Sequence, residues 1–262
     1  LRIVSQSSPT GTQYLQAVGC ALARRMEKTK DIVYVSSGEG TTSQGDFHEA
    51  LNWASNAKAP VIFHVQDNEY AISTHKSEQS ASSVFSMASG YKSLSRYEVN
   101  GTNFFETNLA FKQAIDRARK GKGPSIIVSN VVRLLPHSSS DDQRKYRPPE
   151  ELEENRKRDP LTIFEDHCIQ EKMFSPQDFV KIRDQISKQV DEESKWAESQ
   201  EYPDADKALD YIYSHKVPMD EPDLNPMGNK VVIVDAVNHA LKEEMAQNNK
   251  MVIYGQDIAD PK

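Results

Sequence analysis

Two short polar segments have the residue types that bind a diphosphate through a metal ion: residues 38–40 and residues 67–70. The carboxylate of Glu39 and the side-chain amide of Asn68 are hard oxygen ligands, which Mg²⁺ takes together with phosphate oxygens. The glycines on either side of Glu39 let backbone N–H groups approach a phosphate, and a helix expected from about Ser43 presents its positive end nearby. A Gly-Glu-Gly triplet alone is more often a plain turn between strand and helix. The second segment, at this spacing, favours a binding site.

The hydrophobic pattern around these segments alternates between strands and helices. Short β-branched or apolar runs predict buried strands, and apolar residues that recur at helical spacing predict amphipathic helices. Pro60 ends one helix, and Gly121 with Gly123 closes another. The expected strands cover residues 32–35, 61–65 and 125–132. The expected helices lie at residues 15–28, from about 43 to 60 and around 111–118, with turns or loops at 36–40 and 66–70.

Such alternation predicts an α/β fold, in which a parallel sheet is flanked by helices. Because the crossovers of such sheets are right-handed, the strands point the same way and the loops after them gather at one edge. Ligands of open α/β sheets bind at this carboxyl edge. Three polar clusters follow the expected strands, at residues 38–40, 67–70 and 136–142. We therefore expect the three clusters to converge.

The composition changes after about residue 148, and a helical C-terminal extension is expected from about 150. The charge-dense run 150–159 is most simply a solvated helix face. Further helices are expected around Leu161 to Cys168, from Ser175 with an apolar stripe (Phe179, Ile182, Ile186, Val190), and at residues 205–213. The Pro- and acid-rich residues 217–229 predict a linker. A new unit from 230, with a helix and a strand at 251–254, stops at 262, so we expect a truncated second α/β domain.

The composition excludes several classes of protein. The 262 residues carry 32 basic and 39 acidic side chains, a net charge of −7, and no basic block indicates binding to nucleic acid or a membrane surface. The longest apolar stretches are far too short to span a bilayer, and no secretory leader is visible. Cys20 and Cys168 lie in expected helices, so we predict two reduced core thiols in a cytoplasmic protein. The chain starts at Leu1 directly in structured-looking sequence, which predicts a fragment.

The spacing of the two polar segments resembles a known family. Gly38-Glu39-Gly40, 26 residues and then Asp67-Asn68 resemble the thiamine-diphosphate motif. Residues 43–52 and 70–74, and the His-Ser-Ser-Ser-Asp-Asp loop at 137–142 followed by Tyr146-Arg147, are similar to segments of thiamine-diphosphate-dependent 2-oxoacid dehydrogenases. The residues from Ser7 to Gly19 look closest to the branched-chain (2-oxoisovalerate) members.

The resemblance implies three parts in the chain. Residues 1–216 look like a diphosphate-binding α component, truncated at its N-terminus. Residues 217–229 are the expected linker, and residues 230–262 look like the start of a pyrimidine-binding β component. A single chain that carries both in this order resembles the fused bacterial form.

The resemblance also implies roles for individual residues. Mg²⁺ would be held by the side chains of Glu39 and Asn68 and by the backbone carbonyl of Tyr70. His137 would approach the cofactor and assist catalysis, although a loop histidine without this context is more often an ordinary surface residue. The other expected cofactor contacts are Ser8 and Thr10 near the aminopyrimidine, Gly38, Gly40 and Thr41 at the diphosphate, and Ala71 and Ile72. A structural K⁺ would involve Ser7, Pro9, Thr12 and Gln13.

The implied reaction is oxidative decarboxylation of a branched-chain 2-oxoacid, with acyl transfer to lipoyl groups of a partner acyltransferase. The cofactor performs the carbanion chemistry, and the protein binds and orients it. The family implies a homodimer of the fused chain. The chain would hold half of an active site, so we expect it to be inactive alone. A pyruvate or acetoin dehydrogenase component is an alternative.

Two acidic residues depart from the family's pattern. Asp67 stands where the motif has Asn, and Glu69 where Gly is usual. They leave open a second alternative, a scaffold subunit of the same fold that has lost the cofactor.

Overall fold

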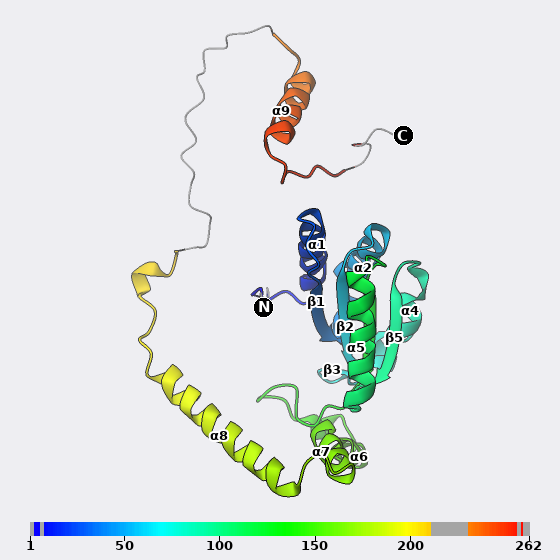
Figure 1. The fold of residues 1–262 in the computed structure, drawn as a ribbon, viewed down its shortest axis with the longest axis vertical. Coiled ribbons are helices and arrows are strands. Elements are labelled where there is room, and N and C mark those ends of the chain that lie inside the picture. The colour runs from blue at the N-terminus through cyan, green and yellow to red at the C-terminus, as the bar shows by residue number, and fades with distance from the viewer. Residues whose placement is uncertain (1–2, 6–7, 211–229, 256–257, 259–262) are drawn as a thin grey trace. The chain divides into compact units, whose positions relative to one another are not determined.

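The computed structural model describes residues 3–5, 8–210, 230–255 and 258 (Figure 1). The chain divides into two compact units, Leu1–Lys195 and Trp196–Lys262. The predicted linker at 217–229 lies outside the described residues, as does the expected boundary near 216. In the described part of the chain, no helix is long and apolar enough to cross a membrane.

A four-stranded parallel sheet forms the centre of the first unit. Its strands are β1 (Val33–Gly38), β2 (Val61–Asp67), β5 (Ser95–Asn100) and β6 (Ser125–Asn130), in the order β1-β2-β6-β5. All three pairings are parallel. The strands therefore end at one edge, and the loops after β1, β2 and β6 meet there as predicted.

Helices cover both faces of this sheet (Figure 1). Apolar residues at helical spacing on α1 (Gln13–Met26) and α2 (Gly45–Ala57) pack against one face, together with α4 (Val84–Met87) and η2 (Ala88–Gly90). The other face packs against α5 (Phe104–Arg119), which presents alanines at every fourth position. Burial of these stripes confirms the predicted α/β fold of a parallel sheet flanked by helices.

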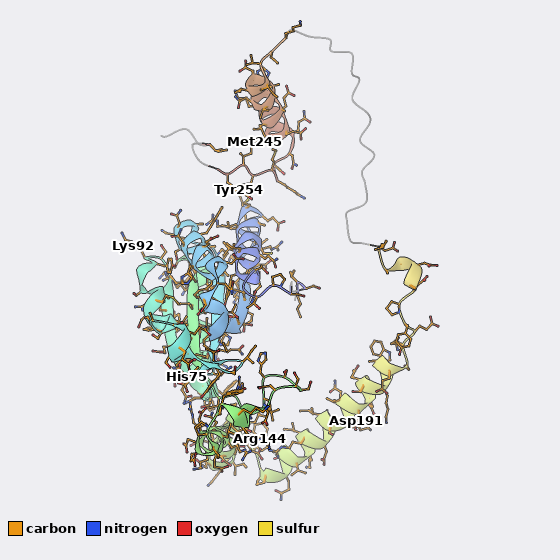
Figure 2. The ribbon with its side chains drawn as sticks, turned by 180° about the vertical axis from the view of Figure 1, so that it is seen from behind. His75, Lys92, Arg144, Asp191, Met245 and Tyr254 are labelled. Carbon is orange, nitrogen blue, oxygen red and sulfur yellow. The ribbon has the colours of Figure 1, made fainter. Side chains whose placement is uncertain are left out.

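A small hairpin and several helices complete the described chain. The hairpin after β2 pairs β3 (Tyr70–Ala71) with β4 (Thr74–His75) and leads into α3 (Lys76–Gln79). After β6 the elements are η3 (Gln143–Lys145), α6 (Pro149–Lys157), α7 (Pro160–Gln170), α8 (Pro176–Glu198), η4 (Ala205–Lys207) and α9 (Ile233–Gln247). The predicted helical extension is therefore present. Residues 181–198 of α8, in which Figure 2 labels Asp191, are exposed throughout.

Several details of the sequence prediction need correction. Strand β1 continues through Gly38 instead of turning at residue 36, and β5 was not expected. Residues 251–254 form no strand, because the described part of the second unit offers no other strand to pair with. Cys20 and Cys168 are both free, but only Cys168 is buried, so Cys20 is no core thiol.

Candidate functional site

The first site loop places a carboxylate inside the protein. Strand β1 ends at Gly38 and passes into a 3-10 turn, η1 (Glu39–Ser43), in which the Thr42 hydroxyl donates to the Glu39 carbonyl at 2.6 Å. Glu39 is only 3% exposed. Its Oε2 accepts a hydrogen bond from the Asn68 backbone N–H at 3.2 Å, whereas its buried Oε1 has no partner.

Burial is the main cause that raises the pKa of Glu39 above its usual range. A half-satisfied buried carboxylate of this kind is unfavourable by itself. A bound cation would give the unpartnered oxygen a ligand contact.

Gly40 lets the first loop touch the second. A Cβ atom at Gly40 would lie 2.6 Å from the Cβ atom of Ala71, closer than real carbon atoms approach. A Cβ atom at Gly38 would meet only the Gln66 carbonyl oxygen, at an ordinary 3.9 Å. Of the two glycines in the motif, only Gly40 is therefore required by close packing against β3.

The second loop is shaped by its own side chains. Asp67 accepts a hydrogen bond from the Glu69 backbone N–H at 3.0 Å, and Asn68 accepts one from the Tyr70 backbone N–H at 3.0 Å. These contacts are Asx turns, in which a short side chain holds the backbone two residues on. Glu69 and Ile72 adopt left-handed backbone conformations, with φ of 73° and 56°. The loop folds back at these two points, whereas the parallel pairing of β1 with β2 places Asn68 beside Glu39.

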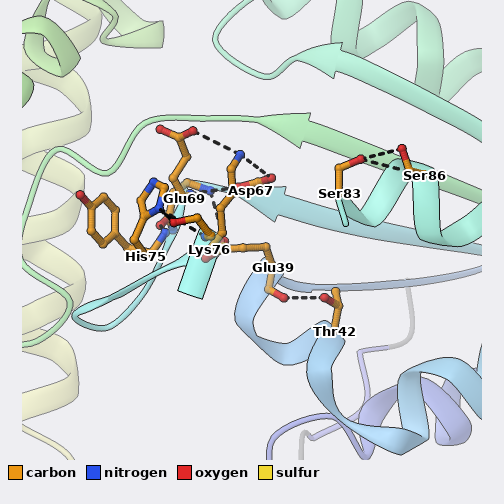
Figure 3. Close-up of polar contacts among 11 residues, drawn as sticks. Glu39, Thr42, Asp67, Glu69, His75, Lys76, Ser83 and Ser86 are labelled. Carbon is orange, nitrogen blue, oxygen red and sulfur yellow. Dashed lines mark hydrogen bonds and ion pairs between the residues drawn. The ribbon is translucent and has the colours of Figure 1, made fainter. Parts of the chain in front are cut away.

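Lys76, which was not identified from the sequence, forms ion pairs with both acidic residues of the second loop (Figure 3). Its Nζ atom lies 3.1 Å from Asp67 Oδ2 and 3.2 Å from Glu69 Oε1. Burial acts to lower the pKa of Lys76, but the hydrogen bonds and charges of the two carboxylates raise it overall. In the sequence, only a lysine seven residues after Glu69 indicated this contact. The β3–β4 hairpin brings the two side chains together.

The N-terminal segment packs beside the first loop. Gly11 has φ of 101°, and a Cβ atom there would lie 2.9 Å from Gln44 Cβ and 3.9 Å from the Thr41 Cγ2 atom. The buried Tyr14 hydroxyl hydrogen-bonds Ser37 at the end of β1. Burial raises the pKa of Tyr14 to about 12, so the phenol stays neutral. This part of the chain thus supports the end of β1 from one side.

The third loop, residues 136–142, is exposed at its tip but anchored at its base. The His137 backbone N–H donates to Asp141 Oδ2 at 2.9 Å, and the Tyr146 hydroxyl donates to the same oxygen at 2.6 Å. The hydrogen bond from Tyr146 is the main cause that lowers the pKa of Asp141. Arg133 donates to Tyr146 at 2.7 Å and to the Ile72 carbonyl at 2.7 Å. The third loop is therefore tied to the β3–β4 hairpin.

Arg147 completes this link from inside the protein. Its side chain is fully buried and donates to Glu151 Oε1, to the Arg133 carbonyl and to Gln143 Oε1, each at 2.8 Å. The Tyr70 hydroxyl donates to the other oxygen of Glu151 at 2.9 Å. In the sequence Arg147 stands out only as part of a motif, because a single charged residue after a polar loop gives no sign that it will be buried.

The predicted site residues fall into three groups. Glu39 and Asn68 are in direct contact, and Gly40 meets Ala71. Tyr70 and Ile72 connect these loops to the base of the third loop, whereas His137 itself is exposed. Ser8 and Thr10 are exposed in the N-terminal turn, in which Thr12 donates to the Pro9 carbonyl and Gln13 accepts from the Gly11 N–H; Ser7 lies outside the described residues.

The donor set of the site fits a divalent cation. In the described residues no group of three or more His, Cys, Asp or Glu could hold a metal. Mg²⁺ needs no such group, since one carboxylate, amide or carbonyl oxygens and phosphate oxygens suffice. The unpartnered Oε1 of Glu39, beside the Asn68 loop, would supply the carboxylate.

Comparison with known proteins finds a family that this chain matches. Residues 1–206 match the family "Dehydrogenase E1 component". Over 214 residues the chain is 42% identical to the 2-oxoisovalerate dehydrogenase subunit alpha of Bacillus subtilis, covering 81% of this chain and 64% of that protein.

Two further relatives are pyruvate dehydrogenase E1 component alpha subunits. The one from Acholeplasma laidlawii is 32% identical, with 76% of this chain and 58% of the relative covered. The one from Staphylococcus aureus is 38% identical, with 59% and 42% covered. The chain thus spans between 42% and 64% of the lengths of these three relatives.

Proposed function

Because this chain belongs to the dehydrogenase E1 component family, we propose that it is the diphosphate-binding half of a thiamine-diphosphate-dependent 2-oxoacid dehydrogenase. The reaction proposed for the whole protein is oxidative decarboxylation of a 2-oxoacid with acyl transfer to the lipoyl group of a partner acyltransferase. Relatives that act on 2-oxoisovalerate and on pyruvate both support a 2-oxoacid substrate.

One observation carries the proposal. Glu39 is buried with one carboxylate oxygen unpartnered, and its other oxygen contacts the loop of Asn68. A protein that used this loop only for folding would gain nothing from a desolvated, half-satisfied carboxylate. A protein that binds a metal-bound diphosphate needs it.

The residues of the site would divide the work as follows. Glu39 and Asn68 would hold Mg²⁺ by their side chains and Tyr70 by its backbone carbonyl, while Gly38, Gly40 and Thr41 would line the diphosphate. Ala71 and Ile72 would bound the cofactor on the side of the hairpin. When bound, thiamine diphosphate would supply the carbanion chemistry of the decarboxylation, and these residues would bind and orient it.

The outer residues of the site would serve the later part of the reaction. His137, on the exposed third loop, would approach the cofactor and move a proton at its imidazole. Arg133 and Arg147 would keep this loop in register with the metal loop through Ile72 and Tyr70. The Ser8 to Thr10 turn would face the aminopyrimidine, with a structural K⁺ nearby.

Binding tests the proposal directly. Thiamine diphosphate should bind the 262-residue chain with Mg²⁺ and not with EDTA, measured by titration calorimetry, and Glu39→Gln should abolish the Mg²⁺-dependent part. The pyrimidine side of the site would come from a β component, so the chain alone should show no 2-oxoacid turnover. A Mg²⁺-independent cofactor affinity, or an unchanged affinity in Glu39→Gln, would contradict the assignment of the site.

The acyl group is a separate question. We propose a branched-chain 2-oxoacid, supported by 42% identity to the B. subtilis 2-oxoisovalerate enzyme against 32% and 38% for the pyruvate enzymes. The assay is decarboxylation by this chain assembled with its β component, comparing 2-oxoisovalerate with pyruvate. A higher kcat/KM for pyruvate would retain the mechanism and change the substrate.

A cofactor-less scaffold is the competing proposal, and it was motivated by Asp67 and Glu69. Lys76 forms ion pairs with both carboxylates. Both carboxylates are therefore paired within the loop, and one of the two extra negative charges is compensated, which weakens the main reason to expect a lost cofactor.

A further inference from the structure

Three carboxylates and one ammonium group meet in the two loops of the site. Asp67 is buried, and its Oδ1 is used by the Glu69 N–H while its Oδ2 accepts from Lys76 at 3.1 Å. Glu69 Oε1 lies 3.2 Å from the same Lys76 nitrogen. Figure 3 shows both carboxylates turned toward Lys76. Glu39 alone among the three forms no ion pair with it.

The backbone also holds Glu69 in this orientation. Its φ of 73° is a left-handed conformation, unfavourable by about 1 kcal/mol for a residue with a side chain. The Lys76 backbone N–H donates to the Glu69 carbonyl at 2.8 Å, and the Glu69 N–H is held by Asp67. Lys76 therefore contacts Glu69 through both its backbone and its side chain, and the turn that brings Lys76 back is the turn that directs Glu69.

We propose that Lys76 is a positioning residue that lets this site accept a magnesium-bound diphosphate despite Asp67 and Glu69. The inference rests on the proposed function. Lys76 holds the two carboxylates away from the metal position, so that Glu39 is the single carboxylate that faces the cation. It also cancels negative charge that would repel the diphosphate.

The proposal predicts opposite effects on two ligands. Without the Lys76 charge, Asp67 and Glu69 become available to a free divalent cation, whose binding should become tighter. The same charges would weaken binding of the cofactor's diphosphate. Loss of an ordinary ion pair predicts neither change. The Lys76 side chain is 37% exposed, and such pairs contribute about 1 kcal/mol or less to stability.

The experiment uses the 262-residue chain and two probes. Mn²⁺ alone is titrated by electron paramagnetic resonance, and thiamine diphosphate is titrated by calorimetry in the presence of Mg²⁺. In Lys76→Met we expect Mn²⁺ to bind about fivefold more tightly and thiamine diphosphate about fivefold to tenfold more weakly. Lys76→Arg should behave as wild type.

Two further variants separate charge from structure. Glu69→Gln in the Lys76→Met background should restore much of the cofactor affinity, because it removes one of the uncompensated charges and keeps the side-chain size. Lys92→Met is the matched control. Lys92 is an exposed lysine at the opposite end of the first unit from His75, the neighbour of Lys76 (Figure 2), and its loss should change neither affinity.

Each outcome decides between the two proposals. Wild-type chain that binds no thiamine diphosphate would overturn the proposed function. Wild-type chain that binds it, with Lys76→Met unchanged or weakened for both probes, would overturn only the role of Lys76. If Lys76→Met does not fold, Glu69→Gln alone still tests the idea. It should leave Mn²⁺ binding nearly unchanged, because Lys76 already holds Glu69 away from the metal position, and cofactor affinity should be at least as high as in wild type. A marked loss of Mn²⁺ affinity would show that Glu69 faces the cation and would refute the role.

Discussion

Replacing Glu39 by glutamine should make the cation-free protein more stable while removing its metal ligand. Glutamine keeps the acceptor for the Asn68 N–H and has nearly the same volume, but it carries no charge. In the native protein the carboxylate is 3% exposed and makes one side-chain hydrogen bond, at 3.2 Å, with Oε1 unpartnered. Substitution therefore removes an unfavourable buried charge without opening a cavity.

The size of the gain follows from the unpartnered oxygen. A buried polar group without a partner costs about 1–3 kcal/mol, and a charged group costs more. The amide nitrogen introduced at this position also lacks a partner, which offsets part of the gain in the free energy of unfolding. We therefore expect the free energy of unfolding of Glu39→Gln to exceed that of wild type by about 1–2 kcal/mol at neutral pH without divalent cations.

The pH dependence provides a second measurement with a defined sign. Burial raises the folded pKa of Glu39 above the unfolded value of about 4.3. Between the unfolded and the folded pKa of Glu39, the folded state binds more protons than the unfolded state. The free energy of unfolding of the wild-type protein therefore falls as the pH rises through this range. The advantage of Glu39→Gln should thus be smallest below the unfolded pKa, where the carboxyl is protonated in both states, and should grow as the pH rises through the folded pKa.

Urea denaturation in EDTA at several pH values provides the test. Glu49→Gln, at an exposed position of α2, is the matched control and should remain within about 0.5 kcal/mol of wild type. If Glu39→Gln is less stable than wild type, or if its advantage is independent of pH, the carboxylate is not strained by burial. The strongest support for a cation site would then be lost.

Three further predictions concern the surrounding structure. Gly40→Ala should destabilise the chain by about 1–3 kcal/mol in thermal or urea unfolding, because its methyl group would lie 2.6 Å from Ala71 Cβ. Arg147→Met should cost about 3 kcal/mol by the same measurement, since Glu151 would lose its buried partner. Burial lowers the pKa of His64 to about 4. As the pH falls, His64 is therefore protonated in the unfolded chain before it is protonated in the folded protein. The free energy of unfolding of wild type, relative to that of His64→Gln, should fall by about 3 kcal/mol as the pH drops from about 6.5 to about 4.

The sequence predicted the elements whose apolar residues recur on one buried face. Strands β2 and β6 are buried almost throughout, and α2 buries residues at helical spacing, so their patterns were clear. Strand β5 was missed because it is an edge strand in which only Val99 is buried. The family resemblance inferred from the motifs is confirmed by the match over residues 1–206.

The site was predicted only in part, for a physical reason. The sequence placed Glu39 and Asn68 at the ends of neighbouring strands, and parallel pairing of β1 with β2 brings them together. The contacts of Lys76 depend instead on left-handed backbone at Glu69 and Ile72, which turns the chain back on itself. Neither residue favours that conformation, so no local pattern predicts it.

The distribution of partners among the acidic residues supports a binding site more strongly than the motif does. Asp67 and Glu69, two acidic departures from the family's pattern, share the ammonium group of Lys76. Glu39 replaces the commoner Asp of the motif but keeps its carboxylate, and it is the one carboxylate in the described part of the chain with a buried, unpartnered oxygen. If the loops served only to fold the chain, compensation would be expected for every buried charge. Here Asp67 and Glu69 are paired with a lysine, whereas Glu39, the expected ligand, keeps one oxygen without a partner. A site that binds a cation together with an anion requires this arrangement.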